Sequence, residues 1–144
     1  MTGEEILGSK AEVNYQYFED VLFEKRIWMP SANISNYLLM FTAPYLGSRD
    51  KHGRRSFKDF LTATSESEVV PRTIVFWNRS VIACFEGSPI LPALSRLDKS
   101  GVKILVSAQA INRMKAMDRL VTGKLANYTD LLDAMHKSQK IITF

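Results

Sequence analysis

Four nearly continuous apolar runs constrain the fold of this chain more than any other feature. They lie at residues 37–43, 73–77, 102–106 and 141–144. Apolar runs of this length are typical of strands that are covered on both faces of a sheet. Helical patterns separate the runs. Strands that alternate with helices predict an α/β fold with a mainly parallel sheet and helices on both of its faces.

Two helices are predicted between the first and third runs. Asp50 can cap the first helix, and Pro71 ends the connection that follows it. The second helix has Ser88 as its N-cap and Pro89 at its first position. Between these helices, residues 81–85 form a short apolar run that fits either a further strand or a return loop. The apolar face of the first helix consists of Phe57, Phe60, Leu61 and Thr64.

Two further helices follow the third apolar run. Ser107 can cap a helix that begins directly after the strand, and Asn127 caps the last helix, with Asp130 three residues later. The residues of the last helix that are expected to face the core are Tyr128, Leu131, Leu132 and Met135.

Residues 1–36 differ in composition and pattern from the rest of the chain. Their segment 12–28 is rich in aromatic and charged residues, with apolar positions close to helical spacing. Pro30 and small polar residues then interrupt the pattern. We therefore expect an N-terminal helix and loop that pack over the main domain, residues 37–144, or over a neighbouring subunit.

The composition restricts the compartment and the partners of the protein. The chain has 144 residues, one cysteine and a formal net charge of +4. A single cysteine cannot form an internal disulfide, and neither a signal peptide nor an apolar run of about 18 residues is visible. These features favour a cytoplasmic protein that does not associate with a membrane.

Polar side chains gather where the predicted parallel strands end. Ligands of α/β sheets bind at the carboxyl ends of the strands, and the loops at this edge are residues 44–50, 78–80 and 107–109. Free N–H groups at a helix start and nearby arginines favour a small anion. The residues expected to hold such a ligand are Arg49, Asn78, Ser107, Ala108, Gln109, Asn112 and Arg113.

A cluster of cationic residues marks the first predicted helix. The ordinary interpretation is a solvated helix face, and the alternative is a site for an anion or an acidic partner. Neither a Walker A sequence, a dinucleotide fingerprint nor a metal-ligand spacing is present, so we expect no cofactor and no metal. The members of the cluster are Arg49, Lys51, Arg54, Arg55 and Lys58.

The order of the motifs resembles one protein family over residues 37–144. The stretches LGSRDKHGRRSFKDFL, TIVFWNRSV, EGSPILPALSRLDKSGVKIL and GKLANYTDLLDAMHKSQKIITF resemble the DsrE/DsrF-like family, most closely the C-terminal domain of YedF-type proteins. The resemblance implies a three-layer α/β/α sandwich and subunits that associate as dimers, trimers or hexamers. It also implies a link to sulfur metabolism, because sulfur-relay members such as TusD and DsrE carry persulfide sulfur on a cysteine. That cysteine lies at the end of the strand before a helix.

This sequence departs from the family at that strand end. Residues 107–110 read Ser-Ala-Gln-Ala, and neither of the cysteines expected there is present. A thiol at a helix N-terminus is activated by the helix dipole, whereas the Ser107 hydroxyl does not ionise near neutral pH and cannot carry a persulfide. We therefore expect a non-catalytic member that forms homo-oligomers, associates with related sulfur-relay subunits, or binds a small anionic ligand.

Two alternative functions stay open. Cys84 lies in the apolar run at residues 81–85, which favours a small buried residue, but as a relocated sulfur carrier it would make the protein a sulfurtransferase. The mildly basic charge leaves a nucleic-acid-binding protein as the second, less favoured alternative. A serine hydrolase is not favoured, because His52 and His136 belong to no recognisable triad with Ser107.

Overall fold

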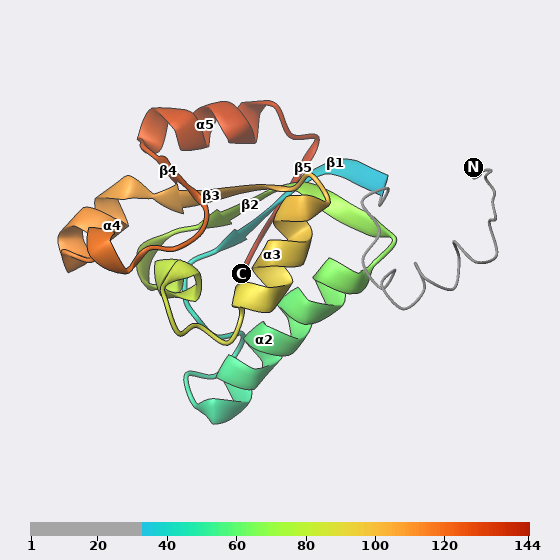
Figure 1. Ribbon diagram of the computed structural model, residues 1–144. Helices are drawn as coiled ribbons and strands as arrows, with labels where there is room; N and C mark the ends of the chain where they lie inside the picture. Colours follow the sequence, from blue (N-terminus) through green and yellow to red (C-terminus); the bar gives the residue numbers. More distant parts are fainter. Residues whose placement is uncertain (1–32) are drawn as a thin grey trace, which may run out of the picture. The chain divides into compact units, whose positions relative to one another are not determined.

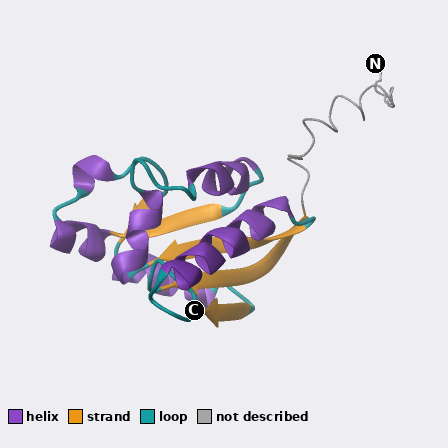
Figure 2. Ribbon diagram, turned by 90° about the horizontal axis from the view of Figure 1, so that it is seen from below, coloured by secondary structure: helices purple, strands orange, loops and turns teal. Residues whose placement is uncertain are grey.

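The computed structural model describes residues 33–144, so the helix and loop expected at residues 1–36 lie almost wholly outside the described residues. Within this described part, five parallel strands form one sheet in the order β4-β3-β2-β1-β5 (Figures 1 and 2). The strands are β1 (Asn33–Phe41), β2 (Val69–Phe76), β3 (Lys103–Ser107), β4 (Lys124–Ala126) and β5 (Lys140–Thr143). The helices are α2 (Lys51–Glu66), α3 (Leu91–Lys99), α4 (Ala108–Met114) and α5 (Tyr128–His136), with the short 3-10 helices η1 (Asn78–Cys84) and η2 (Met117–Arg119).

The handedness of the connections explains the layers. From β1 to β4 each strand adds on the same side of the one before it, so right-handed crossovers place α2, α3 and α4 on one face of the sheet. The connection from β4 to β5 runs back to the other side of β1, and α5 therefore lies on the opposite face (Figure 1). The result is the predicted three-layer α/β/α sandwich. Within residues 33–144, none of the helices has the length and apolar character that a membrane crossing requires.

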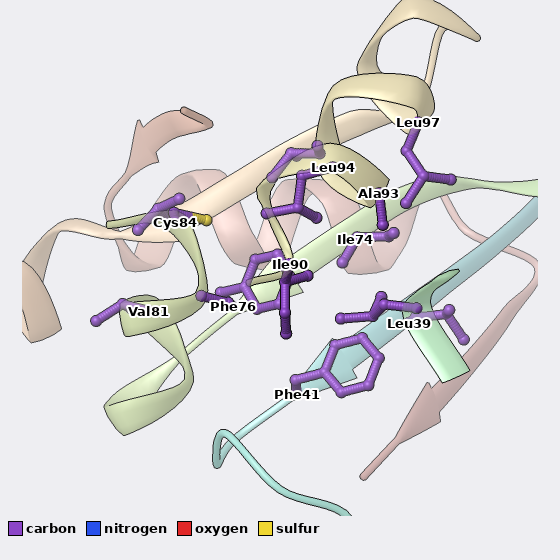
Figure 3. Close-up of a cluster of buried hydrophobic side chains, with 14 of the residues drawn as sticks. Leu39, Phe41, Ile74, Phe76, Val81, Cys84, Ile90, Ala93, Leu94 and Leu97 are labelled. Atoms are coloured by element: carbon purple, nitrogen blue, oxygen red, sulfur yellow. The ribbon is translucent and has the colours of Figure 1, made fainter. Parts of the chain in front are cut away.

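Two hydrophobic clusters fill the spaces between the layers. Along β1, Leu39 and Phe41 belong to the cluster under α2 and α3, whereas Leu38 and Met40 belong to the cluster under α5. This alternation follows from the two-residue period of a strand, and it explains why the strand sequences are almost continuously apolar. Figure 3 shows the larger cluster, in which side chains of β1, β2, η1 and α3 meet.

Two strands begin earlier than the apolar runs predict. β1 starts at Asn33 and β2 at Val69, and Pro71 lies inside β2 rather than in the connection before it. The pairing of the two strands shifts register between Ser35 and Leu38 of β1, beside Pro71. Proline has no N–H to donate to a ladder, so an irregularity in the neighbouring strand accommodates it.

The apolar run at residues 81–85 lies largely in η1 and is not a regular strand. Asn78 opens this helix with a φ of 55°, a conformation that asparagine tolerates. The Ser80 hydroxyl is fully buried and donates to the carbonyl of Phe41 at 2.7 Å, and the Trp77 N–H lies 2.9 Å from the same hydroxyl oxygen. Ser80 therefore ties the ends of β1 and β2 together and turns the chain away from the sheet.

The helix α3 begins later than predicted. Its N-cap is Ile90, and the proline in its first turn is Pro92 rather than Pro89. The Ser88 hydroxyl accepts the N–H of Ile90 at 3.1 Å, so Ser88 stabilises the turn before the helix instead of capping the helix itself.

The last helix, α5, begins at its predicted cap, Asn127, but buries less of its apolar face than predicted. Leu131 is buried and Met135 is half-buried, whereas Tyr128 and Leu132 are 44% and 53% exposed. A short helix contacts a sheet along a narrow stripe of residues spaced four apart, and Leu132 falls beside that stripe. The prediction that all four residues face the core is wrong for Tyr128 and Leu132.

The loop between β1 and α2 folds back on the first turn of α2. The Leu46 N–H donates to the carbonyl of Gly53 at 3.0 Å, and the Asp50 carboxylate accepts the N–H groups of His52 and Gly53 at 3.0 and 3.2 Å. A Cβ atom on Gly53 would lie 1.6 Å from the carbonyl oxygen of Ser48. The close approach of two backbone segments therefore requires glycine at this position.

Gly53→Ala is expected to lower the free energy of unfolding by about 3 kcal/mol, because the loop backbone must move away from the added methyl group. Gly47→Ala is the matched control in the same loop. Its φ is +78° but nothing lies within 4 Å of its Cβ position, so backbone strain alone costs about 1 kcal/mol. Urea unfolding measures both variants, and equal losses would contradict the role of the close contact.

Candidate functional site

The segments after β2 and β3 meet at the carboxyl ends of the strands, where the sequence predicted a ligand site. They enclose a hollow of about 260 Å³, called here the strand-end hollow, which is lined by Asn78 and Arg79 of η1 and by Ala110, Arg113 and Met114 of α4. Two of the predicted ligand residues, Asn78 and Arg113, are thus brought together although 35 residues separate them in the sequence. The two guanidinium groups give the hollow a positive charge.

The other predicted ligand residues do not line the strand-end hollow. Ala108 and Gln109 are half-buried, and Asn112 is exposed. The Oε1 atom of Gln109 is buried and has no hydrogen-bond partner among residues 33–144. Arg49 lies in the loop that folds back on α2, and it lines neither this hollow nor the larger cavity beside α2.

Ser107 serves as the N-cap of α4. Its side chain is fully buried, and its hydroxyl accepts the N–H of Ala110 at 3.3 Å. The strand-end hollow between the segments after β2 and β3 does not reach Ser107, which is absent from its lining. The predicted cap is present, and the hydroxyl is closed off from solvent.

Cys84 lies at the end of η1 within the larger hydrophobic cluster (Figure 3). Its side chain is fully buried, and this burial raises the pKa of the Cys84 thiol to about 12. The thiolate is the form that attacks sulfur donors, and a thiol with this pKa forms almost none near neutral pH. The geometry therefore gives no support to Cys84 as a sulfur carrier.

A larger cavity of about 850 Å³ lies between α2 and η1 and was not predicted from the sequence. We call it the α2–η1 cavity. Four members of the predicted cationic cluster line one wall, namely Lys51, Arg54, Arg55 and Lys58, and Ile82 and Phe85 are on another. The sequence signal was incomplete, because residues 81–85 fitted either a strand or a loop and gave no reason to place Ile82 beside the cations.

Three of the N–H groups at the start of α2 are already bonded. That of Arg54 donates to the Asp50 carbonyl. Asp50 accepts those of His52 and Gly53. Its carboxylate also accepts the Ser48 hydroxyl at 2.6 Å, and these hydrogen bonds, the Ser48 bond foremost, lower the pKa of the Asp50 carboxyl. A negative charge therefore occupies the helix start, and an anion in the α2–η1 cavity has to be held by side chains.

Within residues 33–144, no group of three or more histidine, cysteine, aspartate or glutamate side chains is placed to hold a metal ion. Arginine and lysine side chains predominate among the polar groups of these sites, where they can hold charge and donate hydrogen bonds, and the α2–η1 cavity also has Asp59 and Glu86 in its lining.

Comparisons with known proteins agree with this architecture. Residues 72–144, slightly more than half of the chain, match the model of the DsrE/DsrF-like family. The crystal structure of the ychN protein from E. coli resembles this structure with a TM-score of 0.55 and 17% sequence identity, over 78% of this chain and 98% of that chain. At that identity the likeness concerns the fold alone. No curated protein sequence matches the chain.

Ser107→Ala is expected to lower the free energy of unfolding by about 1 kcal/mol, because the buried N–H of Ala110 loses its acceptor. Ser107→Cys, made in a Cys84→Ala background, should lose a similar amount, since sulfur is a weak acceptor. Its thiol should stay unreactive toward iodoacetamide in the native protein. Urea unfolding and mass spectrometry measure the two effects. Alkylation at the rate of free cysteine would show that the strand end is open to solvent.

Proposed function

This chain belongs to the DsrE/DsrF-like family, and from that premise we propose that it is a member without sulfur chemistry of its own. The family is associated with sulfur relay, in which a strand-end cysteine carries the sulfur. The observation that carries the proposal is the junction of β3 and α4, where Ser107 is fully buried and its hydroxyl is engaged with the backbone. The protein then acts by associating with copies of itself or with related subunits, and by binding a small anion.

The single cysteine of the chain supports the absence of sulfur transfer. Cys84 is the chain's only thiol, and it is fully buried in the hydrophobic cluster. A carrier thiol has to be reached by a donor protein and has to ionise, and burial opposes both requirements. Sulfur transfer through Cys84 would require η1 to leave its place in the core.

Incubation with a cysteine desulfurase and cysteine is expected to leave the native chain without a persulfide, because Cys84 is neither accessible nor ionised. Intact-mass spectrometry without reductant detects an added sulfur atom. Ile82→Cys in a Cys84→Ala background is the matched control, because it places an exposed thiol in the same 3-10 helix. A persulfide on Cys84 in the native chain would establish the sulfurtransferase alternative and overturn the proposal.

The strand-end hollow supports a small anionic ligand. Arg79 and Arg113 line it, and neither guanidinium takes part in an ion pair within residues 33–144. Guanidinium groups hold carboxylate, sulfate or phosphate through paired hydrogen bonds. The volume of about 260 Å³ favours an anion of a few heavy atoms over a larger molecule.

The edge strand β5 supports association with a second copy of the chain. All four of its residues are exposed, including Ile141 at 43% and Ile142 at 37%. Ile141 pairs with Leu38 and Ile142 with Leu39, so the edge is apolar on both faces of the sheet. Within residues 33–144 no strand pairs with the outer side of β5. Such an edge beside exposed apolar side chains favours packing against another chain, and most proteins avoid it when they are monomers.

Changing Ile141 and Ile142 together to lysine is expected to reduce the number of subunits in the assembly, because two charges would be buried at the edge. Light scattering measures the molar mass, and thermal unfolding checks that the variant is folded. Val121→Lys is the control, since Val121 is a 55% exposed apolar residue between η2 and β4. A monomeric native chain, or an unchanged subunit number in the double variant, would contradict association through β5.

A further inference from the structure

The α2–η1 cavity has a size and an apolar lining that the proposed function does not use. Its volume of about 850 Å³ falls within the range of about 300–1,000 Å³ that is usual for small-molecule sites. Apolar side chains come from three segments that are distant in sequence: Phe57 of α2, the stretch from η1 to the start of α3 with Ile82, Phe85 and Ile90, and Met114 of α4. Phe57, Phe85 and Ile90 are already buried and form the floor of the cavity, whereas Ile82 and Met114 are 38% and 41% exposed. A ligand with an apolar body would remove these two side chains from water, which is favourable.

Cationic side chains outnumber carboxylates around the same cavity. Arg55 is the one whose charge is partly offset, by Asp59 at 3.8 Å. Within residues 33–144 no ion pair neutralises Lys51, Arg54 or Lys58. The charge therefore favours an anionic group on the ligand. The lining residues with charge are Lys51, Arg54, Arg55, Lys58, Arg119, Asp59 and Glu86.

The wall opposite α2 is held in place by contacts of its own. The guanidinium carbon of Arg119 lies 5.5 Å from the centre of the Phe85 ring, a cation–π contact that positions this charge against the apolar lining. The Glu86 N–H donates to the carbonyl of Arg119 at 2.9 Å, and the Val121 N–H donates to the carbonyl of Cys84 at 3.0 Å. The cavity is thus formed before any ligand enters, which reduces the entropy cost of binding.

We propose that the α2–η1 cavity binds an organic anion with an apolar body, such as a medium-chain or aromatic carboxylate. The acidic group lies among Lys51, Arg54 and Lys58, and the body lies against Ile82, Phe85 and Met114. A sugar or a peptide would leave its polar groups unpaired against this lining, and an inorganic anion would leave the apolar surface uncovered. This site adjoins the strand-end hollow at Met114, which lines both, but its cations Lys51, Arg54 and Lys58 come from α2, whereas those of the strand-end hollow are Arg79 and Arg113. It does not depend on association through β5.

The test uses two fluorescent probes that share an aromatic body and differ in charge. 8-Anilinonaphthalene-1-sulfonate (ANS) carries a sulfonate, and N-phenyl-1-naphthylamine is its neutral counterpart. ANS is expected to bind to one site on each chain about tenfold more tightly than the neutral probe. Decanoate should displace ANS at about one-tenth of the concentration at which decanol does. Equal affinities for the charged and neutral probes would reduce the cavity to an apolar patch and overturn the proposal.

Charge variants and a methyl signal locate the site. Arg54→Gln combined with Lys58→Gln should weaken ANS binding about tenfold. Each exposed charge contact is expected to contribute about threefold to fourfold to the affinity, and the two contributions multiply. The affinity for the neutral probe should stay within about twofold of the native value. Arg49→Gln is the control, because Arg49 is a neighbouring exposed cation that does not line the cavity. All three residues are exposed, and urea unfolding verifies that each variant is folded.

The methionine methyl groups report where the probe lies. In a spectrum of protein labelled with ¹³C-methyl methionine, ANS should shift the signal of Met114, which lines both the cavity and the strand-end hollow. The double charge variant of α2 decides between these two places. The signal of Met40 should stay in place, because Met40 belongs to the cluster on the opposite face of the sheet. If the Met114 signal is unmoved, or if the double charge variant binds ANS as the native chain does, ANS lies elsewhere and the proposal is wrong.

Discussion

The ring of Phe41, the last residue of β1, is the contact on which the functional edge of the sheet depends. It stacks on Phe76 with ring centres 5.6 Å apart and on Phe144 at 5.0 Å, and it meets Phe57 edge-on at 5.3 Å. The ends of β1 and β2, the helix α2 and the last residue of the chain are thereby joined around one buried ring. Each such pair contributes about 0.5–1.5 kcal/mol beyond the burial of its area. The carbonyl of Phe41 also accepts the Ser80 hydroxyl, so the same residue positions η1.

Both hollows at the strand ends follow from that arrangement. Phe57 fixes α2 through Phe41 and at the same time lines the α2–η1 cavity, and Ser80 fixes the 3-10 helix that forms the facing wall. The cationic side chains of α2 are exposed and line the same cavity, while Asp50 accepts the N–H groups of His52 and Gly53 at the helix start. An apolar interior beneath a positive rim is therefore a consequence of how α2 is anchored and capped.

The junction of β3 and α4 separates two roles that a cysteine combines in sulfur-carrying relatives. A residue at this place starts the helix, and a thiol there also gains acidity from the helix dipole. Ser107 retains the first role, because its hydroxyl accepts the N–H of Ala110. It lacks the second, because a hydroxyl does not ionise near neutral pH. The chain's one thiol, Cys84, is placed where burial raises its pKa to about 12. The helix cap is thus present at the junction, and no thiol is.

Local patterns in the sequence were enough to predict the class of fold and most helix starts. Continuous apolar runs indicated strands covered on both faces, and Asp50, Ser107 and Asn127 are caps as predicted, because a cap depends on hydrogen bonds within three residues of itself. The early starts of β1 and β2 were not visible, because polar residues and Pro71 owe their strand conformation to pairing with a distant neighbour.

The candidate site residues show the same difference between what local sequence predicts and what packing determines. The sequence by itself determined that residue 107 has no thiol, that Cys84 is the only cysteine, and that cations cluster on the first helix. Only the tertiary structure decided that Asn78 meets Arg113, that Arg49 stands apart from both hollows, and that Ile82 and Met114 lie beside the cations. The physical reason is that residue chemistry and capping act over one helical turn, whereas a cavity is set by packing between segments tens of residues apart.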